Sequence, residues 1–153
     1  MKLASLRKGG RDGTLVVVSR DLKHAASAAH IAPTLQAALE DWPTVEPELK
    51  SLYRLLNEGL LSGAFALDPS ALAAPLPRAY QFLDGSAYLN HAELVRKARG
   101  AELPPSFYTD PMMYQAVSDG FLGPTEDIAL ASADWGIDFE AELTVVLDDV
   151  PMG

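Results

Sequence analysis

The chain has 153 residues, 48% of them hydrophobic and 22% charged, a balance typical of a globular protein and not of a disordered one. The formal net charge of −9 argues against a nucleic-acid partner, because affinity for a phosphate backbone comes largely from lysine and arginine. No cysteine is present, so disulfides, thiolate catalysis and zinc–thiolate sites are excluded. The sequence has no apolar run of the ~18 residues that span a membrane and no signal-peptide core, which predicts a cytoplasmic protein without a membrane partner.

The first segments are expected to pair as a β-hairpin. Residues 15–18 form the β-branched run L-V-V-V between turn signals, and residues 2–6 are the candidate partner strand. His24 and His30 follow, six positions apart and on no common helical face, and are assigned to the surface or a loop.

Two helices are expected next. Thr34 can cap a helix that continues to Trp42, where Pro43 disfavours continuation. Thr44 can cap a second helix that runs to about Glu58, and an apolar stripe on that helix indicates packing and no chemistry. The stripe consists of Val45, Leu49, Leu52, Tyr53 and Leu56, and Gly59 fits the position just after the helix end.

A proline-rich passage, D-P-S-A-L-A-A-P-L-P-R at residues 68–78, excludes a regular helix or a central strand. It is the best domain boundary in the chain and divides it into residues 1–78 and 79–153. The first domain would consist of the hairpin and the two helices.

The second part is predicted to contain a short strand at 79–83, a short helix at 91–98, an irregular loop at 104–112 and the clearest strand of all at 138–147. Asp84 and Gly85 are read as a turn. Strands and helices in separate runs predict an α+β fold that is rich in β-structure.

The candidate site residues each have a structural alternative. Glu140 and Glu142 share one face of the expected strand and could hold a hard divalent cation, although solvated acids on a half-buried strand are common. His91 could transfer protons at neutral pH, although a single histidine near a helix start is more often structural. Tyr108 and Tyr114 could donate phenolic hydrogen bonds, although aromatic residues beside methionines more often belong to a core.

The order Asp84, then N-H-A-E at 90–93, then Tyr114, then W-G-I-D-F-E-A-E-L at 135–143 resembles the fumarylacetoacetate hydrolase family. The resemblance is closest to a bacterial branch with an extra N-terminal domain, and it extends to K-L-A-S-L and A-P-T-L-Q-A-A-L-E-D-W in the first part. It implies that residues 79–153 begin a fumarylacetoacetase-like mixed β-sandwich roll.

The resemblance also implies roles for the site residues. Glu140 and Glu142 would bind Mg²⁺ or Ca²⁺, with Asp84 as a further metal ligand. His91 would be the general base, and Tyr114 would contact the substrate. Asp138 keeps the reading of a solvated acid.

Two departures from the family pattern accompany these matches. In some relatives the histidine motif is H-x-x-E, and its glutamate orients the imidazole. Here Glu93 lies one position too early, and Leu94 occupies the position of that glutamate. The family's catalytic domain also continues past the E-x-E strand to another metal-binding aspartate and a lysine. We therefore expect the 153 residues to be the front part of a longer enzyme, inactive in isolation.

The implied reaction is hydrolysis of a carbon–carbon bond in a β-diketo acid such as fumarylacetoacetate, a step of tyrosine and aromatic amino acid catabolism, by a homodimer. Two alternatives stay open. A 2-oxo acid hydratase, decarboxylase or isomerase would use the same fold and E-x-E site, and a truncated relative could be a non-catalytic interaction module.

Overall fold

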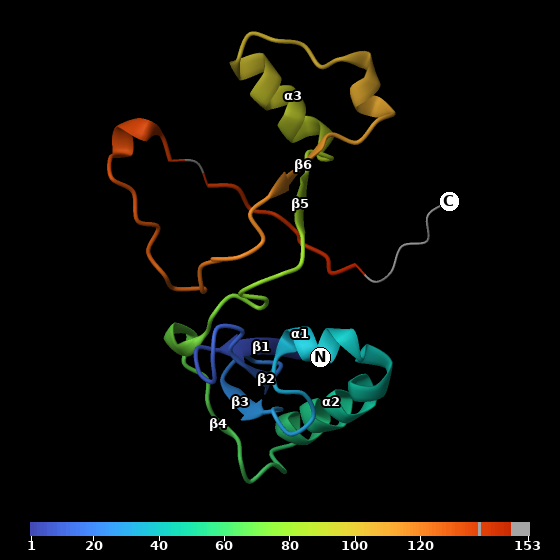
Figure 1. Ribbon diagram of the computed structural model, residues 1–153, viewed down its shortest axis with the longest axis vertical. Helices are drawn as coiled ribbons and strands as arrows, with labels where there is room; N and C mark the ends of the chain where they lie inside the picture. Colours follow the sequence, from blue (N-terminus) through green and yellow to red (C-terminus); the bar gives the residue numbers. More distant parts are fainter. Residues whose placement is uncertain (138, 148–153) are drawn as a thin grey trace.

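The computed structural model describes residues 1–137 and 139–147, and Figure 1 shows a four-stranded antiparallel sheet in the first part of the chain. The order of its strands is β1 (Lys2–Leu6), β2 (Thr14–Val18), β3 (His24–Ser27) and β4 (Phe65–Ala66). β1 and β2 pair from Lys2 opposite Val18 to Leu6 opposite Thr14, which confirms the expected hairpin. β3 and β4 have no strong sequence pattern and were not predicted.

The core surrounds β2, whose side chains alternate between two buried faces. Leu15 and Val17 point toward the helices, whereas Val16 and Val18 pack with Ala25 on the opposite face. Because both faces are covered, β2 is a continuous apolar run without the polar alternation of a half-exposed strand.

Helix α1 (Leu35–Glu40) begins as the sequence predicts. The Thr34 side chain accepts a hydrogen bond from the backbone N–H of Ala37 at 3.1 Å, which confirms Thr34 as the N-cap. The helix ends at Glu40, two residues before the expected end at Trp42.

Helix α2 (Trp42–Asn57) begins earlier than expected, and the assignment of Thr44 as its N-cap is wrong. Asp41 is the cap residue, and Pro43 lies within the first turn. Proline is well tolerated there, because the first N–H groups of a helix have no partner within it. Gly59 follows the helix with φ +71°, as expected for that position.

The apolar stripe of α2 faces the sheet, as the periodicity predicts. Val45, Leu49, Leu52 and Leu56 are all buried and join the cluster that contains Leu15 of β2. This helix is therefore a packing element, and the first part of the chain is a small sheet with two helices on one face.

The proline-rich passage contains a 3₁₀ turn, Pro69–Ala71, capped by Asp68, and isolated β-bridges at Leu72 and Arg78. This agrees with the exclusion of a regular helix or central strand. Two hydrogen bonds hold the passage to β1: Ala73 N–H donates to the carbonyl of Ser5, and the Ser5 hydroxyl donates to the carbonyl of Pro75. The division of the chain into residues 1–78 and 79–153 stays a prediction.

The second part is built on a two-stranded antiparallel ladder of β5 (Phe82–Gly85) and β6 (Met113–Ala116). The strand expected at 79–83 is thus shifted, and the reading of Asp84 and Gly85 as a turn is wrong. Both residues lie within β5, because the unpredicted strand β6 supplies their pairing partners.

Between these strands the chain forms α3 (Leu89–Ala98), which confirms the short helix expected there, and a 3₁₀ turn at Pro105–Tyr108. A third 3₁₀ turn, Ala133–Trp135, follows β6. The α+β class is confirmed by this mixture of helices and small antiparallel sheets.

The strand expected at 138–147 does not form over the part of it that the structure describes, residues 139–147. Strand structure needs backbone partners, and none of the named strands pairs with this segment. Its apolar side chains are accordingly in solvent, with Phe139 87% and Leu143 95% exposed. We call residues 139–147 the acidic segment, because it carries Glu140 and Glu142; the position of Asp138 lies outside the described residues.

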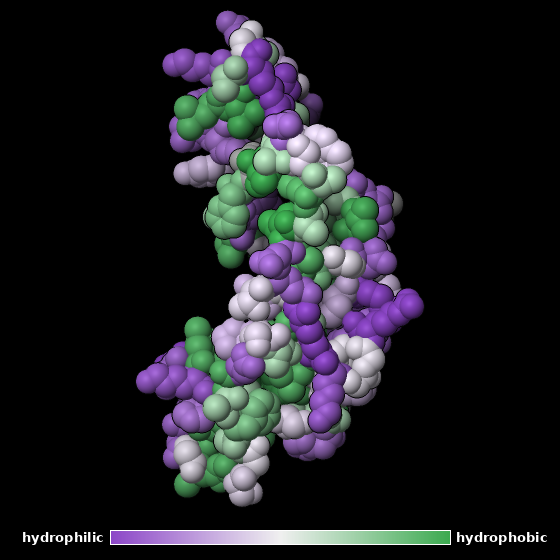
Figure 2. Space-filling view, turned by 90° about the vertical axis from the view of Figure 1, so that its left-hand side faces the viewer, coloured by the Kyte–Doolittle hydropathy of each residue, from purple (hydrophilic) through white to green (hydrophobic). Residues whose placement is uncertain are grey.

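Figure 2 shows apolar side chains at the surface of the upper half of the molecule, where β5, β6 and α3 lie in Figure 1. This exposure is consistent with the few buried residues of that half. Among the helices of residues 1–137 and 139–147, none combines the length and apolar character needed to cross a membrane.

Candidate active site

Asp84 and Tyr114 form the best-defined contact of the candidate site. They lie directly opposite each other in the β5–β6 ladder, and the Tyr114 hydroxyl donates a hydrogen bond to Asp84 Oδ2 at 2.6 Å. This hydrogen bond, together with the charge of Asp84, raises the pKa of Tyr114 above its ordinary value. The phenol therefore stays protonated at neutral pH and can act as a hydrogen-bond donor.

His91 lies in the first turn of α3 and faces the acidic segment. Its Nε2 is 3.6 Å from Glu140 Oε1, close enough for an ion pair when the imidazole is protonated and too long for a hydrogen bond. Both side chains are nearly half exposed.

The acidic segment also approaches the ladder. The hydrogen bond to Asp84, the charge of Asp84 and desolvation raise the pKa of Tyr114 most, and the charges of Glu142 and Glu140 raise it further. The five residues singled out from the sequence thus lie in one neighbourhood: Asp84 on β5, His91 on α3, Tyr114 on β6, and Glu140 and Glu142 on the acidic segment.

A divalent cation would find the right kind of donors in this neighbourhood but no assembled coordination sphere. Asp84, Glu140 and Glu142 offer carboxylate oxygens, which Mg²⁺ and Ca²⁺ prefer. Within the described part of the chain, however, no three acidic or histidine side chains are grouped so that they could hold one ion. The donor chemistry fits a hard cation, whereas the present spacing of the three carboxylates does not.

The remaining candidates lie elsewhere. Glu93 is the acceptor of a long contact from the Tyr108 hydroxyl, at 3.5 Å, and has no contact with His91 among those described. His24 is on β3 and His30 in the following turn, both exposed, as expected for surface residues. Tyr108 is 60% exposed and is not a core residue.

Two contacts of the site were missed from the sequence. The pairing of Asp84 with Tyr114 was hidden by the Asp-Gly turn pattern, and the four residues of β6 give no strong strand signal. The partner acid of His91 in this structure is Glu140, 49 positions later (140 − 91). The sequence did not indicate this contact, because Glu140 was assigned to the cation and the partner acid of His91 was left open.

Comparison with protein families matches nearly the whole sequence. Residues 1–78 match the model described as fumarylacetoacetase N-terminal domain 2, and residues 81–152 match that of the fumarylacetoacetate (FAA) hydrolase C-terminal domain. The first match alone covers just over half of the chain. The chain belongs to the fumarylacetoacetate hydrolase family. A search of curated proteins found no significant match.

Membership of the fumarylacetoacetate hydrolase family confirms the resemblance noted in the sequence, including the branch with an N-terminal domain. It places the chain among hydrolase-type enzymes, a family in which divalent metal ions are common. All five site residues fall within the range matched by the FAA hydrolase C-terminal model.

Proposed function

We propose that this protein hydrolyses a carbon–carbon bond in a β-diketo acid of the fumarylacetoacetate or acylpyruvate type. The observation that carries the proposal is the neighbourhood of Asp84, His91, Tyr114 and the two glutamates of the acidic segment, within the range of the FAA hydrolase match. Cytoplasmic location, a homodimer and a place in aromatic amino acid catabolism belong to the same proposal.

The proposed cation ligands are Glu140, Glu142 and Asp84, with Mg²⁺ or Ca²⁺ as the ion. Such an ion, when bound, acts as a Lewis acid on the substrate's carbonyl oxygens. Both glutamates must be ionised to coordinate, so they act as ligands and not as the acid and base of the reaction. Binding would require the acidic segment to bring its carboxylates closer to Asp84 than they lie in the described arrangement.

His91 is proposed to take a proton from water as the water oxygen adds to a carbonyl carbon of the substrate. The carbon–carbon bond then breaks, its electron pair leaves with the enolate carbon, and that carbon takes up a proton. The products are a carboxylic acid and a ketone. In the described structure Tyr114 donates its single hydroxyl hydrogen to Asp84. We propose that this hydrogen bond passes to a substrate oxygen when Asp84 turns toward the cation, so that Tyr114 then orients the substrate.

Cation binding tests the metal part of the proposal. Glu140→Gln removes one anionic ligand while keeping the size of the side chain, and we expect the affinity for Mg²⁺ or Ca²⁺ to fall at least about tenfold. Glu48→Gln, at an exposed position of α2, is the matched control and should bind as the parent does. Isothermal titration calorimetry with each ion measures the difference; equal affinity in the two variants would remove Glu140 from the site.

Turnover tests the role of His91. In the full-length product of the gene, His91→Ala should lower kcat by about 10²- to 10⁴-fold, the usual contribution of a positioned proton acceptor, without changing cation affinity. Loss of the substrate's ultraviolet absorbance measures the rate, and chromatography of the products separates hydrolysis from hydration, decarboxylation or isomerisation. His30→Ala, an exposed histidine far from the site in sequence, is the control. Unchanged turnover in His91→Ala would contradict its role as the base.

A further inference from the structure

The β5–β6 ladder, which carries Asp84 and Tyr114, has little apolar packing to hold it in place. Among the described residues beyond Arg78, only Ala92 and Phe107 are buried hydrophobic side chains, and neither lies in the ladder. The buried clusters belong instead to the first part of the chain. The position of the ladder must therefore depend on other contacts.

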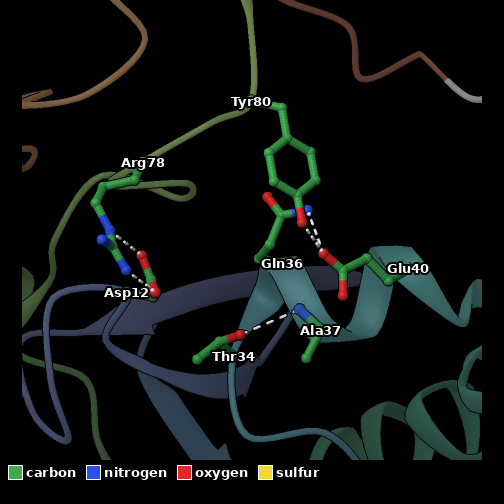
Figure 3. A network of polar contacts seen from close by, with 7 residues as sticks. All are labelled: Asp12, Thr34, Gln36, Ala37, Glu40, Arg78 and Tyr80. Carbon is green, nitrogen blue, oxygen red and sulfur yellow. Dashed lines mark hydrogen bonds and ion pairs between the residues drawn. The ribbon is translucent and has the colours of Figure 1, made fainter.

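The first of these contacts joins Arg78, four residues before β5, to the turn between β1 and β2. Arg78 Nε donates to Asp12 Oδ1 at 2.8 Å and Arg78 Nη2 donates to Asp12 Oδ2 at 2.6 Å, as Figure 3 shows. A bidentate pair fixes direction as well as distance, because two nitrogens of the planar guanidinium, Nε and Nη2, are engaged. Both side chains keep partial access to solvent.

The second contact joins the segment after β6 to the same turn. Arg7 Nη1 donates to Glu126 Oε1, while Glu126 Oε2 accepts from the backbone N–H of Gly123. Arg7 Nε also donates to the carbonyl of Leu72 at 2.9 Å. Gly123 is buried so closely that an added Cβ would lie 2.5 Å from the Leu72 carbonyl oxygen.

Further contacts connect the Asp12–Arg78 and Arg7–Glu126 pairs to the ladder itself. Ala79 N–H donates to the carbonyl of Ser118 at 2.7 Å, which extends the antiparallel pairing to residues before the start of β5 and after the end of β6. Phe82 of β5 packs edge-to-face on Phe121, with ring centroids 5.2 Å apart. One end of the ladder is therefore continuous with Arg78 on one strand and with the Gly123–Glu126 turn on the other.

A third polar contact comes from α1. The Tyr80 hydroxyl donates to Glu40 Oε1 at 2.5 Å, as Figure 3 shows. Tyr80 is 80% exposed, so this contact contributes direction and little burial. The contacts of Arg7 with Glu126 and of Tyr80 with Glu40 join the first part of the chain to one end of the ladder. The Asp12–Arg78 pair lies within the first part and fixes the residue from which the chain runs into that end of the ladder.

We propose that the β1–β2 turn is a positioning element for the candidate active site, with Arg7 and Asp12 as its positioning residues. They act through Glu126 and Arg78, which hold the two strands of the ladder at one end, so that Asp84 and Tyr114 are presented to the acidic segment in a fixed register. This role gives the N-terminal domain a part in the site although it supplies no residue to it. The link to catalysis rests on the proposed function, whereas the fastening of the ladder does not.

A double-mutant cycle on the full chain tests the proposal. The variants are Asp12→Ala, Arg78→Ala and the double substitution, and the readout is amide hydrogen exchange of Phe82–Gly85 and Met113–Ala116. We expect each single variant to speed exchange in the ladder by about fivefold, the scale of a hydrogen-bonded charge pair, and the double variant to add little more. Arg54→Ala, which breaks the exposed Arg54–Glu58 pair on α2, is the matched control and should leave the ladder unchanged.

The outcomes separate the inference from the proposed function. Slow exchange in β1 and β2 of each variant shows that the first part stays folded, so a general loss of structure cannot imitate the result. Ladder exchange equal to that of Arg54→Ala, or strictly additive effects in the double variant, would overturn the inference. A Mg²⁺ titration of the same proteins reports on the site: faster ladder exchange without cation binding in any protein overturns the metal proposal and leaves the positioning role intact.

Discussion

At the scale of single residues, Asp12 shows how one ion pair links stability to pH. The hydrogen bond from Arg78, and secondarily the charge of Arg78, hold the pKa of Asp12 below its ordinary value of 3.8. A lowered pKa in the folded state means that folding favours the ionised carboxylate. The contribution is complete above the pKa of the unfolded chain and is lost as pH falls through the lower folded value.

Acid titration is therefore expected to destabilise the protein below about pH 4, because the folded state must give up these ionised contacts. The pKa values of three other carboxyl groups are also lowered, each mainly through hydrogen bonds to the carboxylate: those of Asp21, Asp68 and Glu126. In Asp12→Asn, the fall in urea midpoint between pH 6 and pH 3 should be smaller than in the parent.

The control for this pH dependence is Asp110→Asn, at an exposed position with no side-chain hydrogen bond among the contacts described. It should retain the full fall in urea midpoint. Equal slopes in Asp12→Asn and Asp110→Asn would show that the Asp12–Arg78 pair does not couple folding to protonation.

Local signals made some residues predictable and others not. Thr34 was predictable as a cap because its partner, Ala37, is three positions away and any helix start needs such a bond. Asp84 was misread because its partner, Tyr114, is 30 positions away and nothing near Asp84 in the sequence indicates that pairing. Contacts of the candidate site that join distant segments required the structure.

At the scale of elements, α2 shows how an apolar stripe fixes a helix. Leu49 is fully buried at the centre of the stripe and packs in the cluster with β2. The 3.6-residue period that predicted this helix is the same feature that buries it, so prediction and packing agree. Its start was misplaced because proline disrupts the interior of a helix but is accepted in the first turn, where Pro43 lies.

Truncation of Leu49 is expected to test this packing. Leu49→Ala should lower the free energy of unfolding by about 2–5 kcal/mol, through lost transfer energy and the cavity left behind. Leu60→Ala, at a leucine that is 67% exposed, should change it by less than about 0.5 kcal/mol. Urea unfolding followed by circular dichroism measures both, and similar losses in the two variants would place Leu49 outside the core.

The acidic segment marks the limit of periodicity as a signal. Alternation of apolar and acidic residues predicts which face of a strand each side chain would lie on. It does not supply the hydrogen-bonding partner that the strand backbone needs. Within residues 139–147 the alternation is present and the strand is not. The same limit explains why β3, β4 and β6, all of four residues or fewer, were recognised only in the structure.

At the scale of the whole molecule, the two parts are joined by polar contacts of Arg7 with Glu126 and of Tyr80 with Glu40, whereas the buried apolar clusters lie in the first part. Composition gave the net charge of −9 but not the placement of the few basic residues. Arg7 lies beside Glu126 of the second part, and Arg78, the last residue of the first part, lies beside Asp12 of the same part. A pattern read along the chain carries no information on such pairs.

The Asp84–Tyr114 pair has a consequence for how the protein can diversify. The chain leaves the ladder after Gly85 and returns to it at Met113, so α3 and the turn after it form an excursion from two adjacent points. Insertions or deletions within this excursion alter the surroundings of His91 without changing which residues oppose each other in the ladder. The fold thus allows the length of the excursion to change while Asp84 and Tyr114 stay opposite each other in the ladder.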